Sequence, residues 1–149
     1  MVASIIMATT ASLDALLKLG SVEFNKLRKA EQVPADYTGA TLVRVTCANA
    51  NLSGLTLAGA EWDSCDLSNI DFRNADLSNA YFHGGRLEDC DFTGANLEGA
   101  SFEKLKLKRC DFSDVKGLVD LEVTKVDMHE VIGLDPDIDD DDDDDEDEA

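Results

Sequence analysis

Apolar and polar residues repeat with a period of five between Ala35 and Asp114. This stretch divides into 16 five-residue units, and the register never slips. The first position of each unit is Ala, Cys, Val, Ile, Leu or Gly, whereas the second, fourth and fifth positions are mostly polar. The middle position is large and apolar in every unit but the one with Cys47: Tyr37, Leu42, Cys47, Leu52, Leu57, Trp62, Leu67, Phe72, Leu77, Phe82, Leu87, Phe92, Leu97, Phe102, Leu107 and Phe112.

A period of five fits neither a plain strand nor a plain helix. It fits an inward residue, an outward residue and a second inward residue, followed by a two-residue corner. Four such sides close a square coil, and stacked coils would pair as parallel strands about 4.8 Å apart. Residues 20 positions apart should then stack, and the middle positions sort accordingly into Leu columns and aromatic columns, such as Phe72, Phe92 and Phe112.

Units such as Ala75-Asp-Leu-Ser-Asn and Ala95-Asn-Leu-Glu-Gly resemble the A(D/N)LXX unit of the pentapeptide-repeat family. The resemblance covers about half of the chain. It implies an all-β fold, a right-handed quadrilateral β-helix of four coils with room for a partial fifth. A fold does not by itself name a function.

We divide the chain into four segments. They are an N-terminal helical cap (1–34), the β-helix (35–114), a C-terminal cap or partial coil (115–134) and a disordered polyacidic tail (135–149). Ser12 can cap a short helix that stops at Gly20, and a second helix is expected from Val22 to about Ala30. Its inward residues should be Val22, Phe24 and Leu27. These helices either cap the first coil or dock a partner. We favour the cap, because the ends of a repeat array need to be covered.

After Asp114 the five-residue pattern lapses, and apolar and polar residues alternate over 119–128. This segment is expected to form a partial fifth coil or a closing strand. The alternative is a dimer or adaptor edge made by Val119, Leu121, Val123, Val126 and Met128.

The net charge of −19 is unevenly distributed. Residues 135–148 hold 12 of the acidic residues and no basic one, so the rest of the chain carries only −7. Such dense like charge predicts a disordered tail. The acidic balance argues against direct nucleic-acid binding, and no stretch is long and apolar enough for a membrane span. We expect a cytoplasmic protein because the N-terminus carries no recognisable secretory signal.

We expect no enzyme, cofactor or metal site. All four cysteines (Cys47, Cys65, Cys90 and Cys110) fall on inward positions, where a thiol is inert, and their spacing matches no zinc motif. The two histidines, His83 and His129, have no evident catalytic partners in the sequence. The fifth-position glycines indicate corners rather than a phosphate-binding loop.

The outward positions hold the candidate partner-binding residues. On the fourth side of the coil, Asp71, Asp91 and Asp111 should stack at about 4.8 Å intervals. The neighbouring side adds Asp36 and Asp76, whereas a smaller basic patch (Arg86, Lys106, Lys108 and Arg109) lies on the third side. Asp or Asn at the second position is also what the repeat itself prefers, so the acidic edge has a structural explanation as well.

The resemblance implies a non-catalytic protein-binding module. Gyrase-inhibiting and quinolone-protecting members of the family present acidic walls that imitate a phosphate backbone. By that likeness, this chain would inhibit or shield a protein with a basic, nucleic-acid-binding surface, either a gyrase-type topoisomerase or a toxin nuclease to which it is the immunity protein. The alternative is a structural adaptor that joins protein assemblies. The sequence leaves monomer and homodimer open.

Overall fold

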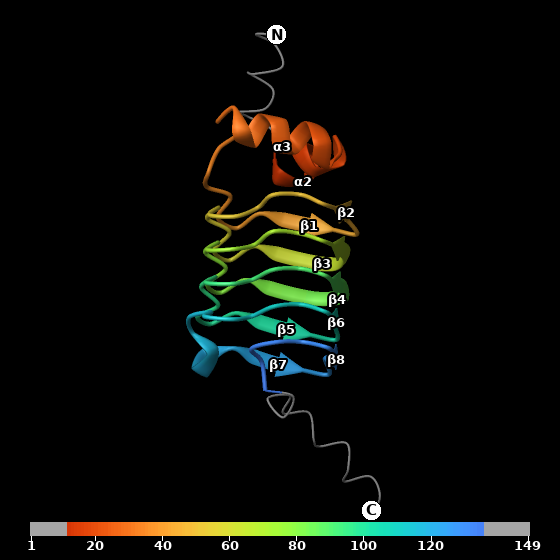
Figure 1. Cartoon of the computed structure of the whole chain (residues 1–149), viewed down its shortest axis with the longest axis vertical. Coiled ribbons are helices and arrows are strands. Elements are labelled where there is room, and N and C mark those ends of the chain that lie inside the picture. Colours follow the sequence, from red (N-terminus) through yellow and green to blue (C-terminus); the bar gives the residue numbers. More distant parts are fainter. Residues whose placement is uncertain (1–11, 136–149) are drawn as a thin grey trace, which may run out of the picture.

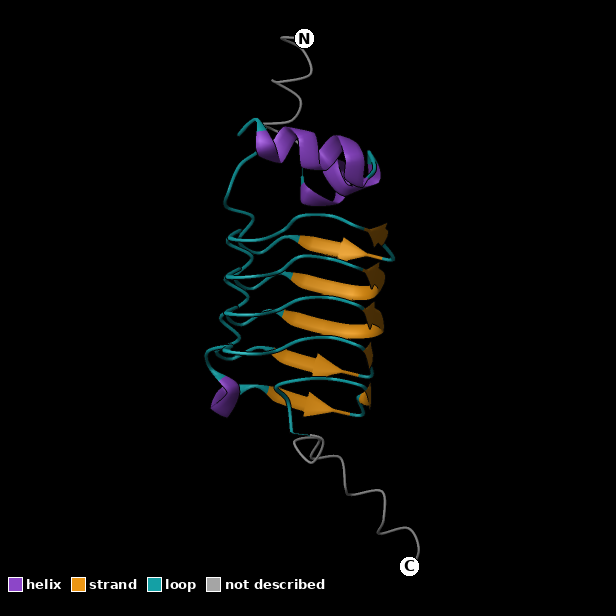
Figure 2. Ribbon diagram, viewed as in Figure 1, coloured by secondary structure: helices purple, strands orange, loops and turns teal. Residues whose placement is uncertain are grey.

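The computed structural model describes residues 12–135 of the chain. It shows a stack of coils with two helices at the N-terminal end (Figure 1). Strands occupy two sides of the stack, and turns occupy the others (Figure 2). All described strand pairs are parallel, which confirms the all-β coil predicted from the five-residue pattern.

The strands follow the predicted 20-residue register. Leu42 pairs with Trp62, Trp62 with Phe82, and Phe82 with Phe102. The first six strands are β1 (Thr41–Val43), β2 (Thr46–Ala48), β3 (Glu61–Ser68), β4 (Tyr81–Glu88), β5 (Ser101–Glu103) and β6 (Lys106–Lys108).

We number the four sides of the coil in chain order. Side 2 contains β1, the first halves of β3 and β4, and β5, whereas side 3 contains β2, the second halves of β3 and β4, and β6. Sides 1 and 4 are joined by single bridges between turns. Their outward columns are Asp36, Thr56, Asp76, Asn96 and Lys116 on side 1, and Asn51, Asp71, Asp91, Asp111 and Ile132 on side 4.

Each corner is made by the fifth residue of a unit. All of these residues from Gly39 to Asp114 have a positive φ, between 51° and 73°. Glycine, asparagine and aspartate tolerate this left-handed conformation better than other residues, which explains why they dominate the fifth position. The corners therefore account for the last position of the five-residue pattern.

The lumen is filled by the columns predicted from the sequence. Phe72, Phe92 and Phe112 lie directly over one another, with ring centroids 4.7 and 4.5 Å apart and planes within 12° of parallel. In the neighbouring column Trp62 stacks on Phe82, whereas Phe102 turns edge-on to it. All of these rings are buried. Offset and edge-on contacts are the geometries that aromatic pairs prefer.

Two helices cover the first coil: α2 (Leu13–Lys18) and α3 (Ser21–Lys29). The Ser12 hydroxyl caps α2, as predicted, by accepting the Ala15 N–H at 3.2 Å. Phe24 and Leu27 face the core, but Val22 is 70% exposed, so its predicted inward position is wrong. Phe24 and Leu27 are three residues apart and share a helix face, whereas Val22 lies two residues before Phe24 and points away.

The segment expected to form a partial fifth coil or a closing strand forms a fifth coil with one extra residue. Asn96 bridges Lys116 at a spacing of 20, but Ser101 pairs with Glu122 at a spacing of 21. The extra residue is taken up by a 3-10 turn, η1 (Leu118–Asp120), and β7 (Glu122–Thr124) and β8 (Asp127–His129) then continue sides 2 and 3. The predicted disordered tail, 135–149, lies outside the described residues except for Asp135.

Candidate partner-binding surfaces

The predicted acidic edge forms two adjacent columns. Asp71, Asp91 and Asp111 are consecutive members of the side 4 column, and Asp36 and Asp76 belong to side 1. Asp36 and Asp76 are not direct neighbours, because Thr56 lies between them. The structure therefore groups the five residues on adjoining sides, with the continuous run of carboxylates on side 4.

Each of these carboxylates also holds its own turn together. Oδ1 of Asp91 accepts the backbone N–H of Thr93 at 2.9 Å and its hydroxyl at 2.5 Å, and Asp111 makes the same bonds to Ser113. Asn51 and Asn96 occupy equivalent positions and also accept the N–H two residues on. These are Asx turns, in which a side-chain oxygen replaces a backbone acceptor. The turn requires an oxygen but no charge, so the charge on the Asp residues is not explained by the turn alone.

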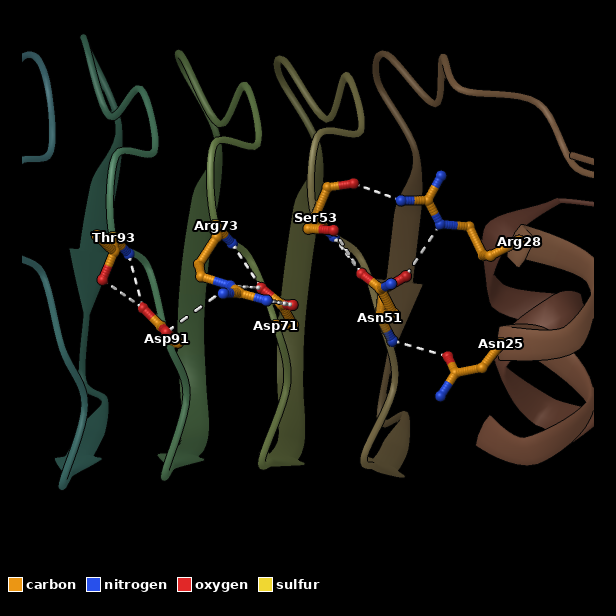
Figure 3. Close-up of polar contacts among 8 residues, drawn as sticks. All are labelled: Asn25, Arg28, Asn51, Ser53, Asp71, Arg73, Asp91 and Thr93. Atoms are coloured by element: carbon orange, nitrogen blue, oxygen red, sulfur yellow. Dashed lines mark hydrogen bonds and ion pairs between the residues drawn. The ribbon is translucent and has the colours of Figure 1, made fainter.

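Two arginines lie along this edge (Figure 3). The Arg73 guanidinium donates to both oxygens of Asp71 at 2.9 and 2.8 Å and lies 3.9 Å from Oδ2 of Asp91. The hydrogen bond from Arg73 is the largest of the effects that lower the pKa of Asp71. Arg28 of α3 donates to the backbone carbonyls of Asn51 and Ser53 in the first coil, which precedes the coil of Asp71. The edge is therefore partly neutralised near the cap, and Asp91 and Asp111 are the more open end.

The residues proposed as a C-terminal edge separate into two groups. Leu121, Val123 and Val126 are buried, so their side chains belong to the core and cannot contact a partner. Val119, by contrast, is 96% exposed, because it lies in the 3-10 turn that accommodates the extra residue. Together with Leu118, Gly133 and Leu134 it lines a shallow hollow at the end of the stack. The fifth member, Met128, is half-buried.

The basic patch on side 3 is largely paired. Arg109 donates to Asp89 and Glu88, both at 2.6 Å, and Arg86 lies 3.4 Å from Asp66. Lys106 pairs in register with Asp127 across β6 and β8. In the outward column of side 3 the adjacent cations Arg86 and Lys106 thus lie between Asp66 and Asp127, so side 3 presents little net charge.

A second acidic wall, on side 2, was not predicted as a site. Tyr81 and His83 project from β4 and stack with ring centroids 5.7 Å apart. Glu61 and Asp63 lie beside them in β3, and Glu103 lies beside His83 in β5. The sequence signal was available, since Tyr81 is the only aromatic residue at an outward position of the repeat. A column of like charges does not identify this wall, because side 2 combines aromatic rings with carboxylates.

The thiols are all buried and free. Burial raises the pKa of Cys47 and Cys65, and a hydrogen bond with Cys110 together with burial raises that of Cys90. Residues 12–135 contain no group of three or more His, Cys, Asp or Glu side chains placed to hold a metal ion. Within the same range, no helix has the length and apolar composition that a membrane span needs.

The fold and its turn-capping Asp and Asn residues define a repeat β-helix that displays short outward side chains on flat walls. Residues 63–94 and 75–114 match the pentapeptide-repeat family, with eight copies of the repeat. Residues 63–114 are thus pentapeptide repeats, as the sequence units indicated.

Several solved structures are similar over the repeat. QnrB1, a plasmid-mediated fluoroquinolone resistance protein, is 22% identical, with a TM-score of 0.41, over 60% of this chain and 46% of QnrB1. Rfr23, a pentapeptide-repeat protein from the cyanobacterium Cyanothece 51142, is 28% identical, with a TM-score of 0.33, over 62% of this chain and 63% of Rfr23. The matched part is thus less than two thirds of either protein. No curated protein matches the chain.

Proposed function

We propose that this protein is a non-catalytic binding module whose acidic wall occupies the nucleic-acid-binding surface of another protein. The observation that carries the proposal is the unbroken run of Asp71, Asp91 and Asp111 on side 4. Their turn bonds use Oδ1, so Oδ2 of Asp111 remains for an outside partner, while Oδ2 of Asp91 lies 3.9 Å from the Arg73 guanidinium, and the Asp91 side chain is 44% exposed.

The wall suits a basic partner for two reasons. Its carboxylates are held on a parallel backbone ladder, so the partner does not have to order them on binding. Their spacing of about 4.8 Å along the stack gives a line of negative charge, and a surface that normally grips a phosphate backbone is complementary to such a line. A gyrase-type topoisomerase and a toxin nuclease both carry a surface of this kind, and we propose a partner of this class.

The negative charge of side 4 can be removed without breaking the turns that the Asp residues hold. Asn51 and Asn96 show that asparagine holds the same turn, so Asp71→Asn, Asp91→Asn and Asp111→Asn together should keep the fold. The matched control removes three carboxylates from side 3 by Asp66→Asn, Glu88→Gln and Asp127→Asn. Both variants change the net charge equally.

The test is affinity capture on immobilised full-length protein, followed by elution with duplex DNA. We expect the wild type to capture a protein that DNA releases. The side 3 control should capture the same protein, and the side 4 variant should fail to do so. A captured protein that DNA does not displace, or that the two variants hold equally well, would contradict the proposal.

A structural adaptor is the second candidate, and the end of the stack favours it. Val119 is 96% exposed and Ile132 is 58% exposed, beside the hollow lined by Leu118 and Leu134. Exposed apolar side chains grouped in this way are typical of protein–protein contacts. If this end joins two copies, Val119→Glu should convert a dimer to a monomer in analytical ultracentrifugation. A wild-type protein that is monomeric at all concentrations would exclude that form of the adaptor.

A further inference from the structure

Tyr81 stands apart from the other aromatic residues of the chain. The sequence has nine Phe, Tyr and Trp residues, and all except Tyr81 are buried. Tyr81 instead lies on the outer face of side 2, in β4, stacked against His83 with the two ring planes 14° apart. An accessible aromatic pair in the middle of a flat sheet is the kind of feature that anchors a binding partner.

Carboxylates surround the ring pair. The Tyr81 hydroxyl donates to Oε2 of Glu103 at 2.7 Å, and Nδ1 of His83 lies 3.5 Å from Oδ1 of Asp63. Glu61 is the register neighbour of Tyr81 in β3. The hydrogen bond to Glu103, then burial and these neighbouring charges, raise the pKa of Tyr81 to about 12, so the ring stays neutral. The rings are thereby held in place within a region of negative potential.

The repeat does not require these acids. On side 4, each Asp accepts a backbone N–H and so holds a turn. On side 2, Asp63 accepts the Ser64 hydroxyl and Glu103 accepts the Tyr81 hydroxyl, both of which are side-chain donors. Holding the turns of the repeat therefore explains part of the acidity on side 4 but not the acidity on side 2. Lys104, whose ammonium lies 3.8 Å from Glu103, and Lys125 are neighbouring cations, and the Lys104 side chain is 55% exposed.

We propose that the side 2 surface formed by Glu61, Asp63, Tyr81, His83 and Glu103 binds an arginine side chain from a basic segment of a partner protein. A guanidinium is planar and weakly hydrated, so it stacks on an aromatic ring while donating to a carboxylate beside it. A lysine ammonium is strongly hydrated and cannot make the paired, planar contact. The surface should thus distinguish arginine from lysine, which a line of carboxylates alone would not do.

This inference rests on the proposed function only in taking the partner to be a basic protein, and it places recognition on a different wall. Side 2 and side 4 are opposite in the four-sided coil, so each can be changed without touching the other. The failure of one assignment would leave the other standing.

The test is an NMR titration of the ¹⁵N-labelled full chain with an arginine homopeptide and a lysine homopeptide of equal length. We expect saturable shifts of the Tyr81, His83 and Glu103 amides, with about 3- to 30-fold tighter binding of the arginine peptide. Tyr81→Ser should abolish that preference, whereas Tyr81→Phe, which keeps the ring, should preserve it. Retained amide dispersion shows that each variant is folded.

The side 4 triple Asn variant is the control, and its side 2 shifts should match those of the wild type. Equal affinity for the two peptides at side 2 would overturn the inference. An arginine preference that survives Tyr81→Ser, or shifts confined to side 4 and residues 136–149, would overturn it equally.

Discussion

The side chain of Asn25 takes the place of a β-strand above Asn51. Its Oδ1 accepts the Asn51 N–H at 2.8 Å, and its Nδ2 donates to the Asn49 carbonyl at 2.8 Å. These backbone groups belong to the first coil, which has no earlier coil to pair with on side 4. The Asn25 amide, together with the Arg28 guanidinium that donates to the Asn51 and Ser53 carbonyls, thus ends the parallel ladder on side 4. The helix α3 covers an open sheet edge that would otherwise invite pairing.

Replacing Asn25 tests this termination. Asn25→Ala removes both hydrogen bonds and should lower the free energy of unfolding by about 1–3 kcal/mol. Lys29→Ala, on the same helix, is the control and should change it by less than about 0.5 kcal/mol. The comparison is made by chemical denaturation. Equal effects of the two substitutions would show that the Asn25 contacts do not stabilise the first coil.

Gly85 should be the least replaceable glycine of the repeat. A Cβ at this position would lie 2.1 Å from the Cys65 carbonyl oxygen, and the residue has a φ of +89°. Gly85→Ala is expected to cost about 2–5 kcal/mol, from backbone strain and overpacking combined. Gly39 has a similar positive φ but no atom within 4 Å of its Cβ, so Gly39→Ala should cost only about 1–2 kcal/mol. Thermal unfolding of the two variants would show the difference, and an equal Tm would contradict it.

The stability of the protein should fall in acid through carboxylates that accept hydrogen bonds. The pKa of Asp71 is lowered, chiefly by the hydrogen bond from Arg73, and hydrogen bonds from Thr38 lower that of Asp36. A depressed pKa in the folded state contributes stability above the unfolded value of about 4, which is lost as the pH falls through the folded value.

Asp71→Asn should therefore flatten the acid side of the stability profile, because the variant has no charge at this position to lose. Urea denaturation between about pH 2 and 7 would measure the profile. A wild-type stability that rises as the pH falls below 4 would contradict the assignment.

The tail of acidic residues should act on the rate of association. Removing residues 136–149 takes away most of the acidic run counted in the sequence. Long-range attraction of a basic partner depends on net charge and is screened beyond about 8–10 Å at physiological salt. We expect slower association at low salt and little change in dissociation, as measured by surface plasmon resonance. An unchanged association rate would remove the tail from the mechanism.

The sequence predicts the coil well because one physical rule is repeated in every unit. The stacking of Phe72, Phe92 and Phe112 follows from the five-residue period, which keeps polar residues out of the lumen, and from the 20-residue spacing that sorts the middle positions into Leu and aromatic columns. Val22 was misplaced because a short helix offers too few turns for its periodicity to be read. The extra residue near Gly117 was not predicted, because the five-residue pattern lapses at that point and gives no register.

The site was less predictable than the fold. The carboxylate columns follow from the register, but their turn bonds do not, because a repeat unit shows which residue recurs and not which atoms it contacts. The same limit applies to Tyr81 and Glu103. Their hydrogen bond joins two coils, 22 residues apart, and depends on the orientation of the ring.

The most direct test of the acidic wall is the salt dependence of binding to the partner that duplex DNA displaces. The dissociation constant is measured at a series of salt concentrations for the wild type, the side 4 triple Asn variant and the side 3 control. We expect the side 4 variant to bind more weakly and with a shallower dependence on salt, while the side 3 control behaves as the wild type does. Identical affinities and slopes for all three proteins would contradict the account.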